Sequence, residues 1–175
     1  MATSPPGSGG DIVNVCVPKF GKVCTPCNAN AECEAPGNSG ARCVDLGSAG
    51  AFCGIACVAN DDCPTGYECK ESKDVAGGTS KQCVVKDGGD CACGESAKAM
   101  ELSTKCYVVS GNMKCEGTRT CLADGHPGAP PGGGLSPCLA PVPDVEACDA
   151  KDNDCDGVTD EDTCDDKNPC TDDRA

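Results

Sequence analysis

Residues 152–161 combine closely spaced acidic side chains with a glycine, a pattern suited to binding a divalent cation. Asp152, Asp154 and Asp156 alternate along the chain, and Gly157 follows them directly. Hard divalent cations prefer oxygen ligands, and an Asp-x-Asp-x-Asp-Gly loop supplies them by curling around the ion. The glycine permits the sharp turn because it lacks a Cβ and reaches backbone angles that other residues avoid. The spacing therefore predicts a Ca²⁺ site.

The oxygen donors can be numbered as in a twelve-residue calcium loop. The three aspartates then occupy positions 1, 3 and 5, the Val158 carbonyl position 7 and Asp160 position 9. Position 12, where a bidentate glutamate is normal, is Thr163, and Glu161 lies close but out of register. The loop then closes with a shifted acid, closes with a water or stays open, so we expect weak binding, about 10⁻⁴–10⁻³ M. The predicted metal ligands are Asp152, Asp154, Asp156, Val158, Asp160 and Glu161.

This acidic loop lies in the most negatively charged part of the chain. The whole sequence has a net charge of −14, and residues 144–175 hold 13 acidic and 3 basic side chains, a net charge of −10. Closely packed carboxylates repel one another, so a bound cation would relieve the repulsion. A solvated, disordered acidic tail is the simpler alternative. Regular spacing and interleaved cysteines are not features of a plain acidic run, and they favour the metal site.

Cysteines are the residues that must hold such a loop in place. The 175 residues include 20 cysteines, an even number, whereas only 2% of the chain is aromatic and tryptophan is absent. Domains with so little large apolar surface use disulfides in place of a buried core. The composition therefore predicts a small disulfide-rich fold with little regular secondary structure, short β-hairpins and several small cysteine-stapled modules in tandem. Cys155, inside the acidic loop, is expected to tie that loop to a neighbouring segment.

Cysteine spacing divides the chain into four segments. A motif of the form Cys-x-Ala-Asn-x-acid-Cys occurs at Cys27–Cys33 and again 30 residues later at Cys57–Cys63, which indicates two related repeats. Further on, Tyr107–Val109 is typical of a strand and Ser110–Asn112 of the turn that follows it. The order of the cysteines leaves their pairing open. The segments are a flexible linker (1–15), two cysteine-rich repeats (16–83), a six-cysteine module with a short β-hairpin (84–138) and an acidic metal-binding region (139–175).

Charge and composition also bear on partners and location. A strongly negative chain is a poor partner for nucleic acid and for anionic membrane surfaces, and no window has the apolar length of a membrane span. The cysteine density indicates an oxidising location, outside the cell or on its surface. Residues 1–10 lack the basic and apolar regions of a signal peptide. We therefore expect a segment of a larger secreted chain, in contact with other extracellular or surface proteins.

Catalysis has little support in the sequence, and we expect no enzyme. His126 is the only histidine and lies in a Gly/Pro-rich stretch, away from any recognisable nucleophile. The stretch Gly37-Asn-Ser-Gly40 superficially resembles a serine-protease loop, but that chemistry needs a rigidly held histidine–acid pair. Cys24-Thr-Pro-Cys27 has the spacing of a redox or zinc site, although in a chain this rich in cysteine, structural disulfides are the better interpretation.

Residues 146–161 resemble a known family. The segment Glu146-Ala-Cys-Asp-Ala-Lys-Asp-Asn-Asp-Cys-Asp-Gly-Val-Thr-Asp-Glu161 is similar to the metal-binding motif of MopE-type surface proteins, a repeat that abounds in large secreted proteins of myxobacteria. The family pattern is Glu-x-Cys-Asp-Gly-x-Asp-Asn-Asp-Cys-Asp-Gly-x-x-Asp-Glu, and Ala150 stands where glycine is usual. The resemblance implies a secreted or surface-exposed, non-catalytic metal-binding region. The family name suggests copper, which favours imidazole or sulfur ligands, so the aspartate-rich loop points instead to Ca²⁺.

These observations together predict an extracellular structural or adhesive module with a Ca²⁺-stabilised acidic loop. Two alternatives remain besides copper binding. A secreted inhibitor-like or receptor-binding protein would present a loop from a disulfide-knotted scaffold, and its binding would be insensitive to chelators. A thiol-active enzyme would expose at least one reactive cysteine.

Overall fold

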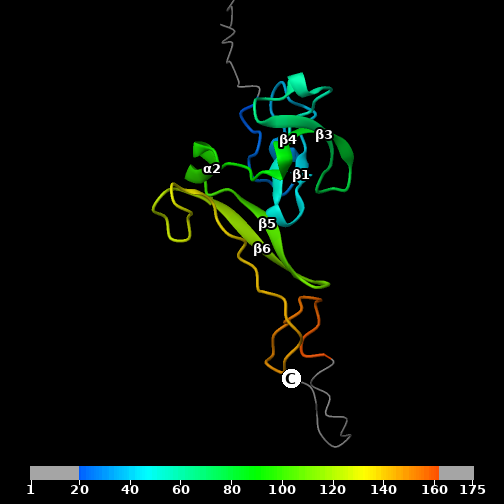
Figure 1. The fold of residues 1–175 in the computed structure, drawn as a ribbon, viewed down its shortest axis with the longest axis vertical. Helices are drawn as coiled ribbons and strands as arrows, with labels where there is room; N and C mark the ends of the chain where they lie inside the picture. The colour runs from blue at the N-terminus through cyan, green and yellow to red at the C-terminus, as the bar shows by residue number, and fades with distance from the viewer. Residues whose placement is uncertain (1–19, 162–175) are drawn as a thin grey trace, which may run out of the picture.

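Short antiparallel strands joined by disulfides make up the computed structural model, which describes residues 20–161 (Figure 1). They form three sheets with the orders β1–β2, β3–β4 and β5–β6–β7. The strands are β1 (Cys43–Asp45), β2 (Ala51–Cys53), β3 (Tyr67–Lys73), β4 (Thr79–Val85), β5 (Ser103–Ser110), β6 (Met113–Leu122) and β7 (Gly134–Leu135). The predicted linker, residues 1–15, and the acidic residues after Glu161 lie outside the described residues.

Helical structure in the described part of the chain is limited to single turns. The two α-helices are α1 (Asn30–Cys33) and α2 (Glu95–Ala99), and the 3₁₀ turns are η1 (Gly47–Ala49), η2 (Asn60–Asp62) and η3 (Lys86–Gly88). Across residues 20–161, no helix has the length and apolar character needed to cross a lipid bilayer. The little helix present follows from the sequence, because frequent glycines, prolines and cysteine crosslinks interrupt any longer helical period.

Cysteine pairing confirms the predicted small disulfide-rich fold. All 17 cysteines of the described part are disulfide-bonded. The pairs are Cys24–Cys91, Cys27–Cys43, Cys33–Cys53, Cys57–Cys69, Cys63–Cys83, Cys93–Cys121, Cys106–Cys138 and Cys115–Cys155, and Cys148 is bonded as well. The interpretation of Cys24-Thr-Pro-Cys27 as structural is confirmed, since its two cysteines bond to different distant partners.

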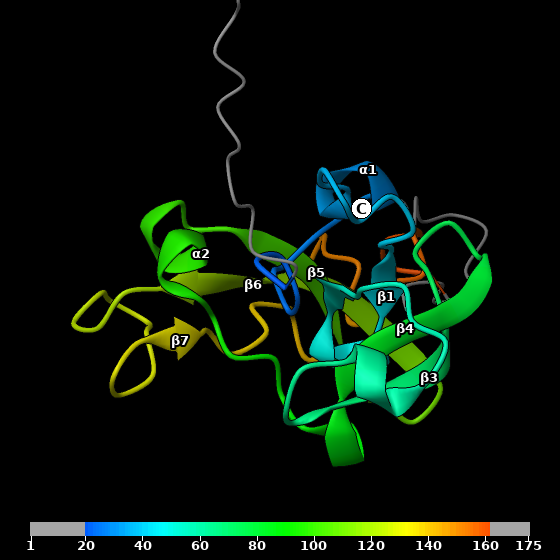
Figure 2. The same ribbon diagram turned by 90° about the horizontal axis from the view of Figure 1, so that it is seen from above.

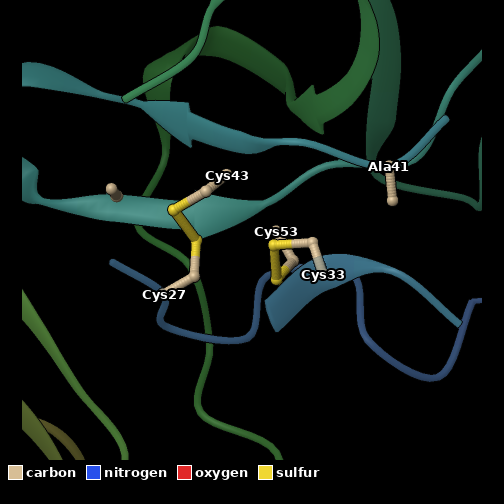
Figure 3. Packing of buried hydrophobic residues seen from close by; sticks show 6 residues of the cluster. Cys27, Cys33, Ala41, Cys43 and Cys53 are labelled. Atoms are coloured by element: carbon tan, nitrogen blue, oxygen red, sulfur yellow. A yellow bond between two sulfur atoms is a disulfide. The ribbon is translucent and has the colours of Figure 1, made fainter. Parts of the chain in front are cut away.

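The two cysteine-rich repeats share one disulfide pattern. Each repeat joins its first motif cysteine to its third cysteine, and its second to its fourth. In the first repeat these pairs are Cys27–Cys43 and Cys33–Cys53 (Figure 3), and in the second they are Cys57–Cys69 and Cys63–Cys83. The third and fourth cysteines lie opposite each other on a two-stranded ribbon, β1–β2 or β3–β4.

Backbone hydrogen bonds recur with the same 30-residue spacing. The Cys27 N–H donates to the Ala51 carbonyl, and the Cys57 N–H donates to the Lys81 carbonyl. The motif asparagine also has one role in both repeats, because Oδ1 of Asn30 and Oδ1 of Asn60 each accept the N–H of the third cysteine at 2.9 Å. The motif acids, Glu32 and Asp62, each accept the N–H of the residue that follows the first cysteine. The sequence motif is therefore a hydrogen-bonding motif.

Sulfur atoms take the place of a large apolar core. One buried cluster consists of Cys27, Cys33, Ala41, Cys43, Ala51 and Cys53 (Figure 3). A second surrounds Phe52, which packs with Cys24 and Cys91. The disulfide between these two cysteines joins the start of the first repeat to the segment that follows the second, 67 residues later. The disulfides thus crosslink the segments around each apolar cluster, and their sulfur atoms form part of its buried interior.

The predicted hairpin after the repeats is formed by β5 and β6. The predicted strand Tyr107–Val109 lies in β5, and the turn passes through Gly111, whose φ of 61° suits glycine. Beyond β6, the chain passes Leu139, which pairs with Thr118. It then reaches the acidic loop at the end of the molecule opposite the repeats (Figure 1). Seen from above, β1, β3 and β4 lie on the side of the molecule away from α2 and β7 (Figure 2).

Candidate metal site

A disulfide and a backbone hydrogen bond hold the acidic loop in shape. Cys155, in the middle of the loop, is bonded to Cys115 of β6, which confirms that it ties the loop to a neighbouring segment. The Asp144 N–H donates to the Asn153 carbonyl at 3.0 Å and brings the two sides of the loop together. Cys148 is disulfide-bonded as well. Among the described residues, the long-range disulfide to β6 therefore positions this site, without a helix directly before the loop.

Glu146 organises the loop from within. Its side chain is buried, and Oε1 accepts the N–H groups of Asn153 at 2.6 Å and Asp154 at 2.9 Å. Oε2 accepts the N–H of Asp160 at 2.9 Å. One carboxylate thus fastens two segments of the loop that are separated by several residues. Hydrogen bonds of this kind, in which the acceptor is charged, are among the stronger ones in proteins.

Asp152, Asp154 and Asp156 converge as the sequence pattern suggests. Each offers a carboxylate oxygen, and the three oxygens lie within 4.8 Å of one another. The two oxygens of Asp152 also accept the N–H groups of Asp156 at 3.1 Å and Gly157 at 3.0 Å. Oδ1 of Asp156 accepts the Val158 N–H at 2.8 Å. A carboxylate has about four lone-pair directions, so it can accept these bonds and still ligate a cation.

A second carboxylate group overlaps the first. Oxygens of Glu146, Asp154 and Glu161 also lie within 4.8 Å of one another, so Asp154 belongs to both groups. A backbone hydrogen bond at Glu161 lowers the pKa of that carboxyl. Partial burial and the neighbouring carboxylates of Glu146, Asp156 and Asp154 outweigh it, and the pKa is raised above its ordinary value. The loop therefore concentrates negative charge that a cation would neutralise.

Asp160 is directed to a different part of the loop. Its carboxylate is buried and accepts the N–H groups of Asp149 at 2.9 Å and of Ala150 at 3.0 Å. It belongs to neither converging group among the described residues. Ala150 and Asp160 both have positive φ, 62° and 58°, so this contact joins two tight turns. The observed role of Asp160 is to close the loop.

The structure thus divides the six predicted ligands. Asp152, Asp154 and Asp156 come together, and Glu161 joins Asp154 in the second group. The Val158 N–H donates to Asp156, and the Val158 side chain is half-exposed. Glu146 was missed as a candidate ligand, because a numbering confined to residues 152–161 leaves it out. Its place at the start of the motif was the signal that could have found it.

Other candidate groups in the described part are not metal sites. Two trios of cysteine sulfurs converge, one in each repeat, but all six are consumed in disulfides and none is a free thiolate. His126 lies beside Glu101, with 3.7 Å between Nε2 and Oε1, in the segment that precedes β7. Within residues 20–161, sulfur and imidazole ligands are therefore not supplied to the acidic loop, whose donors are oxygens.

No family model, no curated protein and no solved structure matches the chain. The resemblance to MopE-type surface proteins accordingly rests on the motif residues 146–161. Within that motif the structure gives the first glutamate a defined role, as an acceptor for three backbone N–H groups. The chemical argument for the site therefore depends on its own geometry.

Proposed function

We propose that residues 144–161 form a Ca²⁺-binding loop in an extracellular structural or adhesive protein of the MopE type. The observation that carries the proposal is the convergence of oxygens from Asp152, Asp154 and Asp156. An all-oxygen donor set suits a hard cation such as Ca²⁺. The resemblance of the whole motif to a metal-binding repeat supports the same function.

The donor set favours calcium over copper. Copper binds imidazole and sulfur ligands in preference to carboxylates. Cys155 is bonded to Cys115, and His126, the only histidine of the sequence, lies beside Glu101 in another segment. Copper binding through sulfur or imidazole would require the Cys115–Cys155 disulfide to be reduced or His126 to move to the loop.

The role of the cation is to stabilise the loop. Without it, the carboxylates around Asp154 repel one another, and this repulsion adds to the effect of partial burial in raising the pKa of Glu161. A cation that binds only the folded loop adds RT ln(1 + [L]/Kd) to stability, about 1.4 kcal/mol at ten times Kd. The disulfide framework holds the rest of the molecule together whether or not the cation is bound. The mechanism is local ordering, with no chemical reaction.

Thermal unfolding with and without calcium tests the proposal. Millimolar Ca²⁺ should raise Tm, a chelator should reverse the change, and isothermal titration should give saturable heat. Asp154→Asn removes the carboxylate common to both groups and should abolish the response. Asp87→Asn makes the same charge change at an exposed residue of η3 and should leave the response intact. Absence of heat and of a thermal shift at millimolar Ca²⁺ would overturn the proposal, and a response to Cu²⁺ alone would favour the copper alternative.

The proposed partners are other extracellular or surface proteins, and the chain would act as a spacer or display element in a larger secreted protein. The eight disulfides with described partners suit an oxidising location. Intact-mass measurement before and after alkylation should detect no reactive thiol at the described cysteines, as expected of a non-catalytic protein. Chelator-insensitive binding to a protease or receptor would instead favour the inhibitor-like alternative.

A further inference from the structure

The hairpin tip of the second repeat rests on the outer edge of the first. Nδ2 of Asn30 donates to Oδ2 of Asp74 at 3.1 Å, and the Val75 N–H donates to the Cys43 carbonyl at 3.0 Å. Val44 and Asp74 form an isolated β-bridge beside these bonds. Asn30 therefore does two things, because its oxygen fastens its own repeat and its amide nitrogen holds the tip of another.

The second repeat has an equivalent edge. Oδ1 of Asn60 accepts the Cys69 N–H, as Asn30 does for the third cysteine of the first repeat. The Cys83 N–H donates to Ile55, so the opposed residues Cys69 and Cys83 direct their backbone groups away from each other. The Cys69 carbonyl thus lies on the outer edge of β3, in the position that the Cys43 carbonyl has in β1.

This second edge carries no hairpin tip within residues 20–161. Asn60 and Lys70 are exposed, whereas Val44, at the position equivalent to Lys70, is buried. No described side chain or loop accepts a hydrogen bond from Nδ2 of Asn60. The side-chain amide of Asn30 donates to the hairpin tip in the first repeat, and the equivalent amide of Asn60 is available in the second.

The repeats are stacked in one direction. The tip of the first repeat rests on the hairpin of the next module, where Arg119 donates to the Ala49 carbonyl at 3.1 Å and the Ala51 N–H donates to Thr104 at 2.8 Å. Figures 1 and 2 both place β1 between β5 and β3. The spatial order is therefore the β5–β6 hairpin, the first repeat and the second repeat. The tip of each repeat contacts its neighbour on the β5–β6 side. The edge of the second repeat is the open end.

We propose that the edge formed by Asn60, Cys69 and Lys70 is an interaction surface for an acidic β-hairpin tip, supplied by a repeat of the same type in a different protein and not by a second copy of this chain. The occupied edge of the first repeat defines the chemistry of that tip. Oδ1 of Asp74 accepts the N–H groups of Ala76 and Gly78 and so shapes the turn, which leaves Oδ2 for the partner asparagine.

Lys70 favours such a tip at the open edge. Where the first repeat has buried Val44, the second has the exposed ammonium group of Lys70, which attracts a carboxylate. A lysine on an unpaired strand edge also opposes indiscriminate strand pairing. The edge is therefore suited to a short acidic turn and poorly suited to a long apolar strand. None of these residues belongs to the acidic loop, so the inference is independent of calcium binding.

A cyclised peptide of residues 71–81, which contains the second-repeat tip, provides the probe. Added to the isotope-labelled protein, it should cause saturable NMR shifts at the Asn60 side-chain amide and at the Cys69 and Lys70 amides. Asn60→Asp keeps the oxygen that accepts the Cys69 N–H but removes the donor, and should weaken binding about tenfold or more. Asn112→Asp adds the same charge at an exposed turn and should have no effect.

A reciprocal exchange makes the test specific. The peptide carrying Asp74→Asn should bind the natural protein poorly but should regain binding to the Asn60→Asp protein, because donor and acceptor have changed places. Absence of shifts, shifts centred on other residues, or equal binding by Asn60→Asp would overturn the proposal. Concentration-dependent shifts of the same signals without peptide would identify a second copy of this chain as the occupant and would also overturn it.

Discussion

Cys115 and Cys155 connect the central strand of the β5–β6–β7 sheet to the middle of the acidic loop. They are 40 residues apart in sequence, and their Cα atoms lie 5.1 Å from each other. Cys115 is fully buried, whereas Cys155 is partly exposed and has a positive φ of 62°. The bond therefore fixes a turn that a non-glycine residue rarely adopts, in the segment that carries the three converging aspartates.

Removal of this disulfide should loosen the loop. The double variant Cys115→Ala, Cys155→Ala avoids free thiols and should lower the free energy of unfolding by about 2–5 kcal/mol. It should also weaken the calcium-dependent rise in Tm, because the aspartates lose their common anchor. The matched control is Cys57→Ala, Cys69→Ala, which removes a disulfide of the second repeat. An unchanged calcium response in the loop variant, with a reduced one in the control, would contradict this role.

Glu146→Gln should weaken the loop without changing its length. The natural carboxylate accepts three backbone N–H groups, whereas glutamine places an NH₂ group opposite one of them. An unsatisfied buried donor costs about 1–3 kcal/mol. Amide hydrogen exchange should therefore accelerate at Asn153, Asp154 or Asp160 while β5 and β6 stay protected. Glu95→Gln, at an exposed residue of α2, is the control. Unaltered exchange at all three amides would refute the assignment.

Ala150→Gly should stabilise the loop, and Gly157→Ala should destabilise it. Left-handed backbone costs a non-glycine residue roughly 1–2 kcal/mol, while glycine costs roughly 0.5–1 kcal/mol through the unfolded chain. Ala150 has φ 62° and Gly157 has φ 96°, and a Cβ on Gly157 would meet nothing within 4 Å. Backbone strain alone therefore sets the two signs. Denaturation with the disulfides intact measures the free energy of unfolding of both variants. Changes of equal sign in the two variants would exclude this explanation.

Asp74 should make folding stability fall in acid. Partial burial raises the pKa of Asp74, but hydrogen bonds from Gly78, Asn30 and Ala76, together with the charge of Arg42, outweigh it and hold the pKa below the ordinary 3.8. A depressed pKa contributes stability above the unfolded value, and this contribution is lost as the pH falls through the folded pKa.

Asp74→Asn should flatten that pH dependence. Its Tm should be lower than that of the natural protein at neutral pH, and the two values should converge as the pH falls below the lowered pKa of Asp74. Thermal scans across this range measure the difference, with Asp87→Asn as the exposed control. A constant difference at all pH values would show that ionisation of Asp74 contributes nothing.

Composition and local spacing predicted much of this protein. The cysteine content and the scarcity of aromatic residues led to the disulfide-rich fold, because a chain without a large core needs crosslinks. The turn at Ser110–Asn112 and the strand before it depend on local preferences, and both are present. The close approach of Asp152, Asp154 and Asp156 also follows from local spacing in a tight loop.

Tertiary structure alone decided which cysteines pair, where Asp160 points and what Glu146 does. The pairing of Cys24 with Cys91 and of Cys115 with Cys155 depends on chain closure over long distances, which the order of cysteines leaves open. A linear loop numbering grouped Asp160 with the three aspartates, but it belongs to neither converging group among the described residues, and its carboxylate accepts N–H groups from a turn ten residues earlier. Local spacing predicts the geometry of neighbouring residues. The partners of a buried hydrogen-bond acceptor depend instead on which backbone N–H groups the folded chain brings next to it.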